Sequence, residues 1–423
     1  MTPGKLKIVL LAGGLVAGLL LAELALQLYS LLTPRRSNIL VRMQAPYALP
    51  DARLGERPNP DYPDHDENGF RNESVPRRAE VVAMGDSQTY GTHVLRAEAW
   101  PSQLQAMSGR SVYSIACGGW GPTHSLVLLD RALAFRPRVL LEAFYPGNDL
   151  YDCFAMVYYQ NHPELRTSDA ALAAEIRNAE SRERLKDHYA KLYDRVLGGG
   201  ATQIAQRLRD GSSPGFKAFL RRHSKLYQLA RILRNAATPK AQKSGWEEEK
   251  RDAQQGDGRE ALRVLESGGW RTIFTPTFRS EGMNLEDPRL AEGFRLCLEA
   301  LERMGSRVRA SGADFVVVLI PTKEIVFRDV VPVPLESDPA YRQAIVDEQR
   351  IRERTIAFMK ERGIAFADPL PALRESLARG VQPYPESLDG HPNARGHQVI
   401  AWFLLEEIER RGLGRSGAPR RGP

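Results

Sequence analysis

Five short apolar runs, each ended by Gly, Pro or Asp, constrain the fold of this chain more than any other feature. Each run is four to seven residues long and shows no alternation of polar and apolar positions. Runs of this kind are typical of parallel strands that are buried on both faces of a sheet. They are residues 80–84, 111–116, 139–145, 315–320 and 364–367.

The segments between these runs have apolar residues at spacings of three and four, which is the pattern of helices with one buried face. Strands that alternate with helices favour a parallel sheet covered by helices on both sides. We therefore expect a three-layer α/β/α sandwich with about five parallel strands. The expected helices are residues 100–107, 124–134, 290–311 and 341–362.

A long insertion separates the third and fourth expected strands. Residues 168–197 and 215–236 have helical patterns, whereas residues 239–258 are charged, poor in apolar side chains and expected to be disordered. The sequence thus divides into six parts. They are a membrane anchor (1–36), an extended linker (37–78), the first part of the sandwich (79–150), the helical insertion (151–264), the second part (265–412) and a disordered tail (413–423).

The anchor is predicted from residues 6–32, an apolar run interrupted by Glu23 and Gln27. A membrane-spanning helix needs roughly 20 apolar residues, whereas the apolar part of a cleaved signal is usually about 7–15 residues long. We therefore favour an uncleaved anchor, with a cleaved signal as the alternative. Glu23 is interpreted as a carboxylate that reaches the membrane interface or, alternatively, as a functional group within the membrane.

Composition argues against several other classes of protein. The net charge of +7 comes from 59 basic and 52 acidic residues that are mixed along the chain, so we expect a solvated surface and no binding of nucleic acid. Cys117, Cys153 and Cys297 lack the spacing of a zinc site and are expected to be free, buried thiols. We expect no metal or other cofactor, because no ligand spacing is found among His65, His93, His124, His162, His188 and His223.

Residues suited to nucleophilic catalysis follow the expected strands. Ser87 follows the first strand in a Gly-Asp-Ser tripeptide, Gly119 follows the second, and Asn148 follows the third in a Gly-Asn-Asp tripeptide. Asp389 and His391 come before the last helix. Open α/β sheets bind ligands at the carboxyl ends of their strands, so these groups should meet. They provide a nucleophile, two hydrogen-bond donors and an imidazole base with a carboxylate to orient it.

This set of blocks, in this order, resembles the SGNH (GDSL-type) hydrolase superfamily. The resemblance implies a flavodoxin-like fold and a catalytic triad in which Ser87 is the nucleophile, His391 the base and Asp389 the group that orients it. It also implies an oxyanion hole made by the N–H groups of Ser87 and Gly119 and by the side chain of Asn148. No cofactor is implied.

The resemblance covers about half of the chain, residues 80–149 and 315–408, and has two departures. The Asp and His are two residues apart rather than three, a spacing that resembles membrane-associated polysaccharide O-acetyltransferases and their bacterial relatives. Ser114 stands where the second block often has Asn, which puts a supporting hydrogen bond in doubt. Residues 68–71 and 320–324 are similar to those of anchored bacterial members, so we expect a single-pass protein of the bacterial inner membrane with a periplasmic body.

Other side chains near the expected site have two interpretations each. Asp86, Trp120 and Lys323 are candidates for substrate binding, Lys323 through an anionic group; the alternative for Lys323 is a capping or salt-bridge role. Trp120 and Tyr145 are expected either to stack on sugars or to pack in the core. His397 is six residues beyond His391 in the expected last helix, so it should face away from the serine and serve a structural role.

The resulting functional prediction is an esterase, or an enzyme that transfers an acyl group, most simply acetyl, on a cell-envelope glycan or another periplasmic ester. Its expected partners are the ester or acylated glycan and the membrane, and no protein partner is predicted. The alternative is a non-catalytic glycan-binding or assembly protein that keeps the same fold. The acceptor of the acyl group, water or a sugar hydroxyl, stays open.

Overall fold

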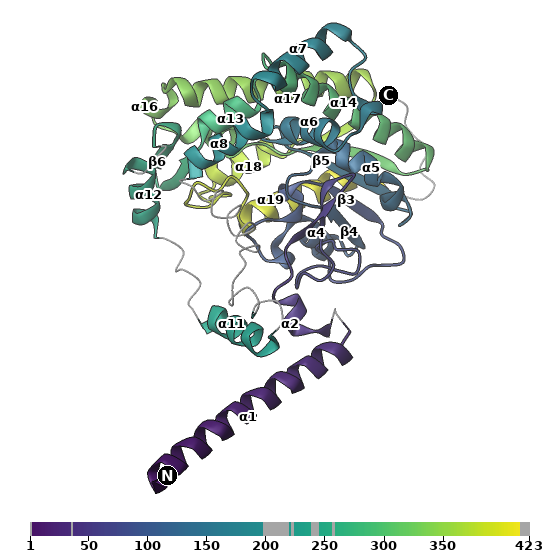
Figure 1. Cartoon of the computed structure of the whole chain (residues 1–423). Coiled ribbons are helices and arrows are strands. Elements are labelled where there is room, and N and C mark those ends of the chain that lie inside the picture. The colour runs from purple at the N-terminus through teal and green to yellow at the C-terminus, as the bar shows by residue number, and fades with distance from the viewer. Residues whose placement is uncertain are drawn as a thin grey trace.

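The computed structural model describes residues 2–34, 37–197, 220, 224–237, 245–255 and 259–414. Within them lies a parallel sheet of five strands in the order β4-β3-β5-β8-β9 (Figure 1). The predicted sandwich is confirmed, and each strand lies within one residue of its expected bounds. The strands are β3 (Val81–Gly85), β4 (Val112–Ala116), β5 (Val139–Phe144), β8 (Asp314–Leu319) and β9 (Ala365–Ala367).

Helices cover both faces of this sheet. Along β3, Val82 and Met84 belong to the core on one face, whereas Val81 and Ala83 belong to the core on the other. Every residue of β3 is buried, which explains why the sequence shows an unbroken apolar run. One layer holds α5 (Pro122–Leu133), α6 (Asp149–Tyr159) and α14 (Pro288–Ala310); the other holds α4 (Trp100–Ser108), α18 (Leu370–Ala378) and α19 (Ala394–Arg410), with α17 (Pro339–Glu361) along β9.

The long helices begin at strong capping residues. Asp287 and Asp338 accept hydrogen bonds from the first turns of α14 and α17, each followed by Pro at the first helical position. Asn393 caps α19 in the same way, through Arg395 N and Gly396 N. Asn393 comes two residues after the Asp389–His391 block. The cap therefore fixes the position of that block relative to the start of α19.

The insertion and the segment that follows it contain helices and a hairpin. The helices α7 (Ala170–Arg182), α8 (Leu185–Leu197), α11 (Lys225–Ala237) and α12 (Trp246–Gln255) lie in the insertion. The antiparallel pair β6 (Arg263–Ser267) and β7 (Trp270–Phe274) begins at its end and is followed by α13 (Pro276–Gly282). Helix α12 falls within the segment that was expected to be disordered. Trp246 is buried, and its Nε1 donates to Glu266 of β6, so one aromatic side chain attaches this charged helix.

Several sequence-based expectations fall outside the described residues. These are the remainder of the expected disordered segment (239–244 and 256–258), residues 215–219 of the second expected helix, His223, and the tail from 415 onward.

The segment 37–78 is not the extended linker that its sequence suggests, because it packs closely on the sandwich. Phe70 is buried, and the Arg71 guanidinium donates to three carbonyls of the loop after Ser87. Asp66 accepts hydrogen bonds from two backbone N–H groups of its own turn, so polar side chains build the segment without apolar periodicity. It contains α2 (Ile39–Arg42) and the antiparallel strands β1 (Ala48–Asp51) and β2 (Gly55–Pro58).

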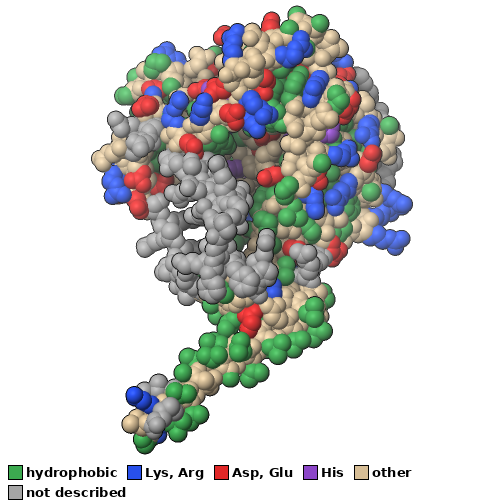
Figure 2. Space-filling model, viewed as in Figure 1, with side chains coloured by type: hydrophobic (Ala, Val, Ile, Leu, Met, Phe, Trp, Pro, Cys, Tyr) green, Lys and Arg blue, Asp and Glu red, His purple; other side chains and the backbone are tan. Residues whose placement is uncertain are grey.

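The N-terminal helix α1 (Pro3–Leu32) extends away from the body, and hydrophobic side chains cover its visible face (Figure 2). Its length and composition would allow it to cross a membrane, although a signal sequence has the same features. Glu23 accepts hydrogen bonds from Ser224 Oγ, Lys225 N and Leu226 N, and so caps α11. Helix α11 consequently lies beside α1, between it and the body (Figure 1).

Candidate active site

Ser87 is the first residue of the short helix α3 (Ser87–Tyr90), directly after β3. Gly85 has a φ of 148°, and a Cβ there would lie 2.5 Å from Thr89 Oγ1, so only glycine fits this turn. Asp86 caps α3 by accepting from Gln88 N at 2.9 Å. The tight turn and its cap present the Ser87 hydroxyl at the carboxyl end of the sheet.

A chain of hydrogen bonds links this serine to the distant Asp-Gly-His block. His391 Nε2 lies 2.9 Å from Ser87 Oγ, and His391 Nδ1 lies 2.6 Å from Asp389 Oδ1. The same carboxylate oxygen accepts from the His391 backbone N–H at 3.1 Å. One local turn therefore orients both the backbone and the ring of His391, which accounts for the short Asp–His spacing.

The second carboxylate oxygen of Asp389 has a histidine partner that the sequence did not indicate. His93 Nδ1 lies 2.5 Å from Asp389 Oδ2, on a residue with a φ of 68° and an exposed side chain. Burial alone would raise the pKa of Asp389, but the hydrogen bonds with His391 and His93 outweigh it and hold that pKa well below its ordinary value. Asp389 is therefore ionised at neutral pH.

His93, Asp389 and His391 also form a set of possible metal donors, since their ligand atoms lie within 4.8 Å of one another. The sequence did not predict this set, because the two histidines are almost 300 residues apart in the chain. The hydrogen bond between Ser87 Oγ and His391 Nε2, in which the hydroxyl donates to the neutral imidazole, instead suits transfer of a proton from hydroxyl to imidazole.

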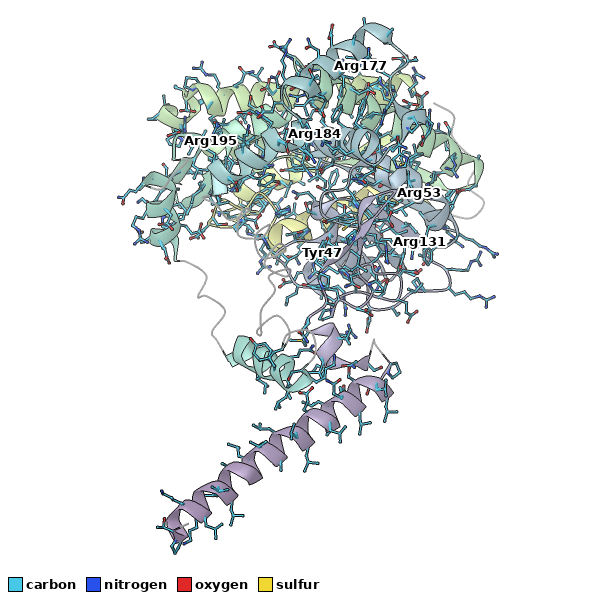
Figure 3. All side chains as sticks on the ribbon, viewed as in Figure 1. Tyr47, Arg53, Arg131, Arg177, Arg184 and Arg195 are labelled. Atoms are coloured by element: carbon cyan, nitrogen blue, oxygen red, sulfur yellow. The ribbon has the colours of Figure 1, made fainter. Side chains whose placement is uncertain are left out.

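The two predicted donors for an oxyanion lie in the same cavity as Ser87. Gly119 has a φ of 76° and follows Gly118, whose N–H donates to Tyr47 Oη at 2.9 Å. Tyr47 is labelled in Figure 3, on the part of the body that lies toward α2. Asn148 Nδ2 donates to Asp152 Oδ2 at 2.6 Å. This bond fixes the orientation of the amide, whose side chain lines the cavity.

The cavity has a volume of about 320 Å³, and five of the 18 residues that line it are Tyr or Phe. Besides Ser87, His391 and the donors, its lining includes residues of the insertion and of the segment after it, which lie outside the resemblance to known sequences. These are Tyr189, Tyr193 and Val196 of α8, and Phe278 and Arg279 of α13. The fold thus uses the insertion to build one wall of the candidate site.

Three predicted substrate-binding residues do not line this cavity. Asp86 is buried beneath the serine turn, where burial raises its pKa to about 6. Trp120 is buried as well, and its Nε1 donates to the Glu56 carbonyl at 3.1 Å. Lys323, the first residue of α15 (Lys323–Phe327), is 1 % exposed. Its three N–H groups point at the carbonyls of Ile273, Ser387 and Asp389, at 2.6, 2.9 and 3.0 Å.

Of the remaining predicted residues, His397 and Ser114 have structural roles, and Tyr145 lines the cavity. His397 is fully buried in α19, accepts from Trp100 N at 3.3 Å and has its pKa lowered to about 3 by burial. The backbone N–H and carbonyl of Ser114 form hydrogen bonds with the side chain of Asn72, which belongs to the packed segment 37–78.

No family model matches this chain, and no curated protein matches its sequence. Several solved structures are similar to it. A protein of the lipolytic G-D-S-L family from Desulfitobacterium hafniense has 10% identity and a TM-score of 0.34 over 78% of this chain and 99% of its own. An extracellular lipase from Streptomyces rimosus has 13% identity and a TM-score of 0.35 over 78% and 98%. An acetylxylan esterase from Geobacillus stearothermophilus has 9% identity and a TM-score of 0.34 over 79% and 95%.

Proposed function

We propose that this chain is a serine esterase or acyltransferase that acts on an ester of the cell envelope. The observation that carries the proposal is the hydrogen-bonded series Ser87, His391 and Asp389 at the wall of a cavity large enough for a small ester. A protein that only bound glycans would have no need for an imidazole held between a carboxylate and an exposed hydroxyl.

In this mechanism Ser87 Oγ attacks the ester carbonyl carbon while its proton passes to His391 Nε2. Asp389 remains ionised, accepts the Nδ1–H hydrogen bond and stabilises the imidazolium that forms. The tetrahedral intermediate then collapses, and His391 returns the proton to the departing alcohol. The product of this half-reaction is an acyl group bound to Ser87.

The negative charge of the intermediate would be stabilised by the N–H groups of Ser87 and Gly119 and by the side-chain amide of Asn148. Ser87 contributes through its position at a helix start, where backbone N–H groups have no intrahelical acceptor. Asp152 holds the Asn148 amide in the donating orientation, and burial raises the Asp152 pKa to about 7.

Deacylation decides between hydrolysis and transfer. Water would give an esterase, whereas a sugar hydroxyl would give an O-acyltransferase on a glycan. The aromatic wall provided by the insertion is suited to the apolar face of a sugar, which supports a glycan as substrate or acceptor.

We further propose that α1 anchors the protein in the bacterial inner membrane and that the body is periplasmic. Thirty helical residues span about 45 Å, more than the roughly 30 Å of the hydrocarbon core. The apolar side chains of α1 are exposed along most of its length, which suits contact with lipid.

The test is acyl turnover by the wild-type protein and by Ser87→Ala. We expect the wild type to release p-nitrophenol from p-nitrophenyl acetate and to be labelled by a fluorophosphonate, and Ser87→Ala to do neither while giving an unchanged circular dichroism spectrum. Mass spectrometry with a glycan acceptor distinguishes transfer from hydrolysis. Equal labelling of both proteins would contradict the assignment of Ser87 as the nucleophile, and no turnover or labelling by the wild type would favour a binding protein.

A further inference from the structure

The cavity contains a buried cation whose role the proposed acyl chemistry does not explain. Arg279 of α13 lines the cavity, and the residue is 8 % exposed. Its guanidinium carbon lies 5.6 Å from the centre of the Tyr145 ring and 5.3 Å from that of Phe278. The two rings therefore restrict its position.

Within the described residues, no acceptor forms a hydrogen bond with the Arg279 side chain, and Nε is buried without a partner. The nearest counter-charge is Glu324, whose Oε2 lies 3.6 Å from Nε, beyond hydrogen-bond distance. Burying a guanidinium with its donors unpaired is costly, and arginines with only a structural role avoid it. Arg289, which is also 8 % exposed, forms hydrogen bonds with Asp287 and with the Glu183 carbonyl.

Arg279 lies next to the catalytic turn. A Cβ on Gly390, the residue between Asp389 and His391, would lie 2.1 Å from Arg279 Nη2 and 3.9 Å from Tyr145 Oη. The Tyr145 hydroxyl is itself buried without a hydrogen-bond partner among the described residues, as is that of Tyr189 of α8. Burial raises the pKa of both phenols, so they remain neutral donors.

We propose that Arg279, assisted by Tyr145, binds a carboxylate on the substrate, so that the proposed enzyme selects esters with an anionic group close to the scissile carbonyl. This inference rests on the proposed esterase or acyltransferase function. The planar guanidinium suits bidentate pairing with a carboxylate. A single negative charge fits better than a phosphate dianion, because Glu324 already offsets part of the positive charge.

The experiment compares kcat/KM for two matched pairs of esters. One pair, p-nitrophenyl acetate and p-nitrophenyl hydrogen succinate, places the carboxylate on the acyl side. The other, acetyl esters of methyl glucoside and methyl glucuronoside, places it on the alcohol side. We expect wild type to prefer the anionic member of one pair, and Arg279→Gln to reduce that preference roughly 10- to 100-fold.

Arg289→Gln is the matched control, because it removes an equally buried arginine outside the cavity, and it should leave the preference unchanged. Arg279→Lys keeps the charge but loses the planar fork, so it should give an intermediate loss, and it substitutes if the Gln variant does not fold. A wild-type protein without preference in either pair, or a preference unchanged in Arg279→Gln, would overturn the inference.

Failure of the proposed function has a different signature, which is no turnover of any of the four esters. In that case, calorimetric titration of wild type and Arg279→Gln with monomethyl succinate and with dimethyl succinate decides the matter. Binding of the anionic probe alone, dependent on Arg279, supports the carboxylate site without the esterase. Equal or absent binding by both proteins refutes the site.

Discussion

Replacing Lys323 with Met distinguishes two roles for this residue. One is support of the catalytic turn through the Asp389 carbonyl, and the other is the substrate binding predicted from its position after a strand. Met keeps a stem of similar length but removes three donors. The Ser387 carbonyl would still accept from Ile273 N and Thr272 Oγ1. The Asp389 carbonyl would have no other donor among the described residues, and an unpaired buried carbonyl costs about 1–3 kcal/mol.

The effect should also depend on pH with a defined sign. Burial lowers the pKa of Lys323 from 10.5 to about 8, so between these values the unfolded chain binds more protons than the folded one. Stability of the wild type relative to Lys323→Met should therefore rise with pH across that window, by about 3 kcal/mol in total. Below pH 8 the amine is charged in both states, so the stability difference between wild type and Lys323→Met no longer changes with pH.

Urea unfolding of the detergent-solubilised chain, followed by circular dichroism at pH 7 and at pH 10.5, measures both quantities. Because Lys323 holds the Asp389 carbonyl, the Met variant should also lower kcat. A substrate-binding role would instead raise KM and leave the free energy of unfolding unchanged. Lys191→Met, at an exposed lysine that pairs with Glu183, is the control and should match wild type. A stability difference that is flat or falls with pH would refute the reasoning.

Four further substitutions test the site. Asp389→Asn should fold normally and lower kcat roughly 10⁴-fold, as expected for a triad carboxylate. His93→Ala should lower kcat only about 10-fold, because His391 still pairs with Asp389 Oδ1 while His93 pairs with Oδ2. Equal losses of kcat in steady-state assays would contradict this order. His397→Ala should lower the urea midpoint, since it leaves a buried N–H without an acceptor, but retain kcat. Tyr47→Phe should reduce kcat more than KM by loosening the turn that carries the oxyanion donor, and unchanged kinetics would argue against that support.

Much of the sandwich could be predicted because its strands are buried on both faces. In β3, one layer of the core holds Val81 and Ala83, and the opposite layer holds Val82 and Met84. Because both faces are buried, no polar residue interrupts this run. The site blocks could be predicted for a related reason. Parallel strands bring their carboxyl ends to one edge, so groups such as Ser87 and Asn148, far apart in sequence, must lie near one another.

The parts that could not be predicted depend on contacts that leave no local pattern. His93 reaches Asp389 from an exposed loop residue, and Arg279 reaches the cavity from a helix that follows an unpredicted hairpin. The segment around Tyr47 and Asp66 appeared extended because turns built by polar side chains show no apolar period. Lys323 follows a strand as expected. Its three N–H donors, however, bind backbone carbonyls of neighbouring segments rather than a substrate.

The cap that Glu23 places on α11 connects two helices that lie about 200 residues apart in the chain. Helix α11 also contacts α2, which belongs to the segment packed on the sandwich. With α1 in the bilayer as proposed, Glu23 holds α11 beside the membrane-spanning helix. Glu23→Gln should weaken that contact without any change at the catalytic residues.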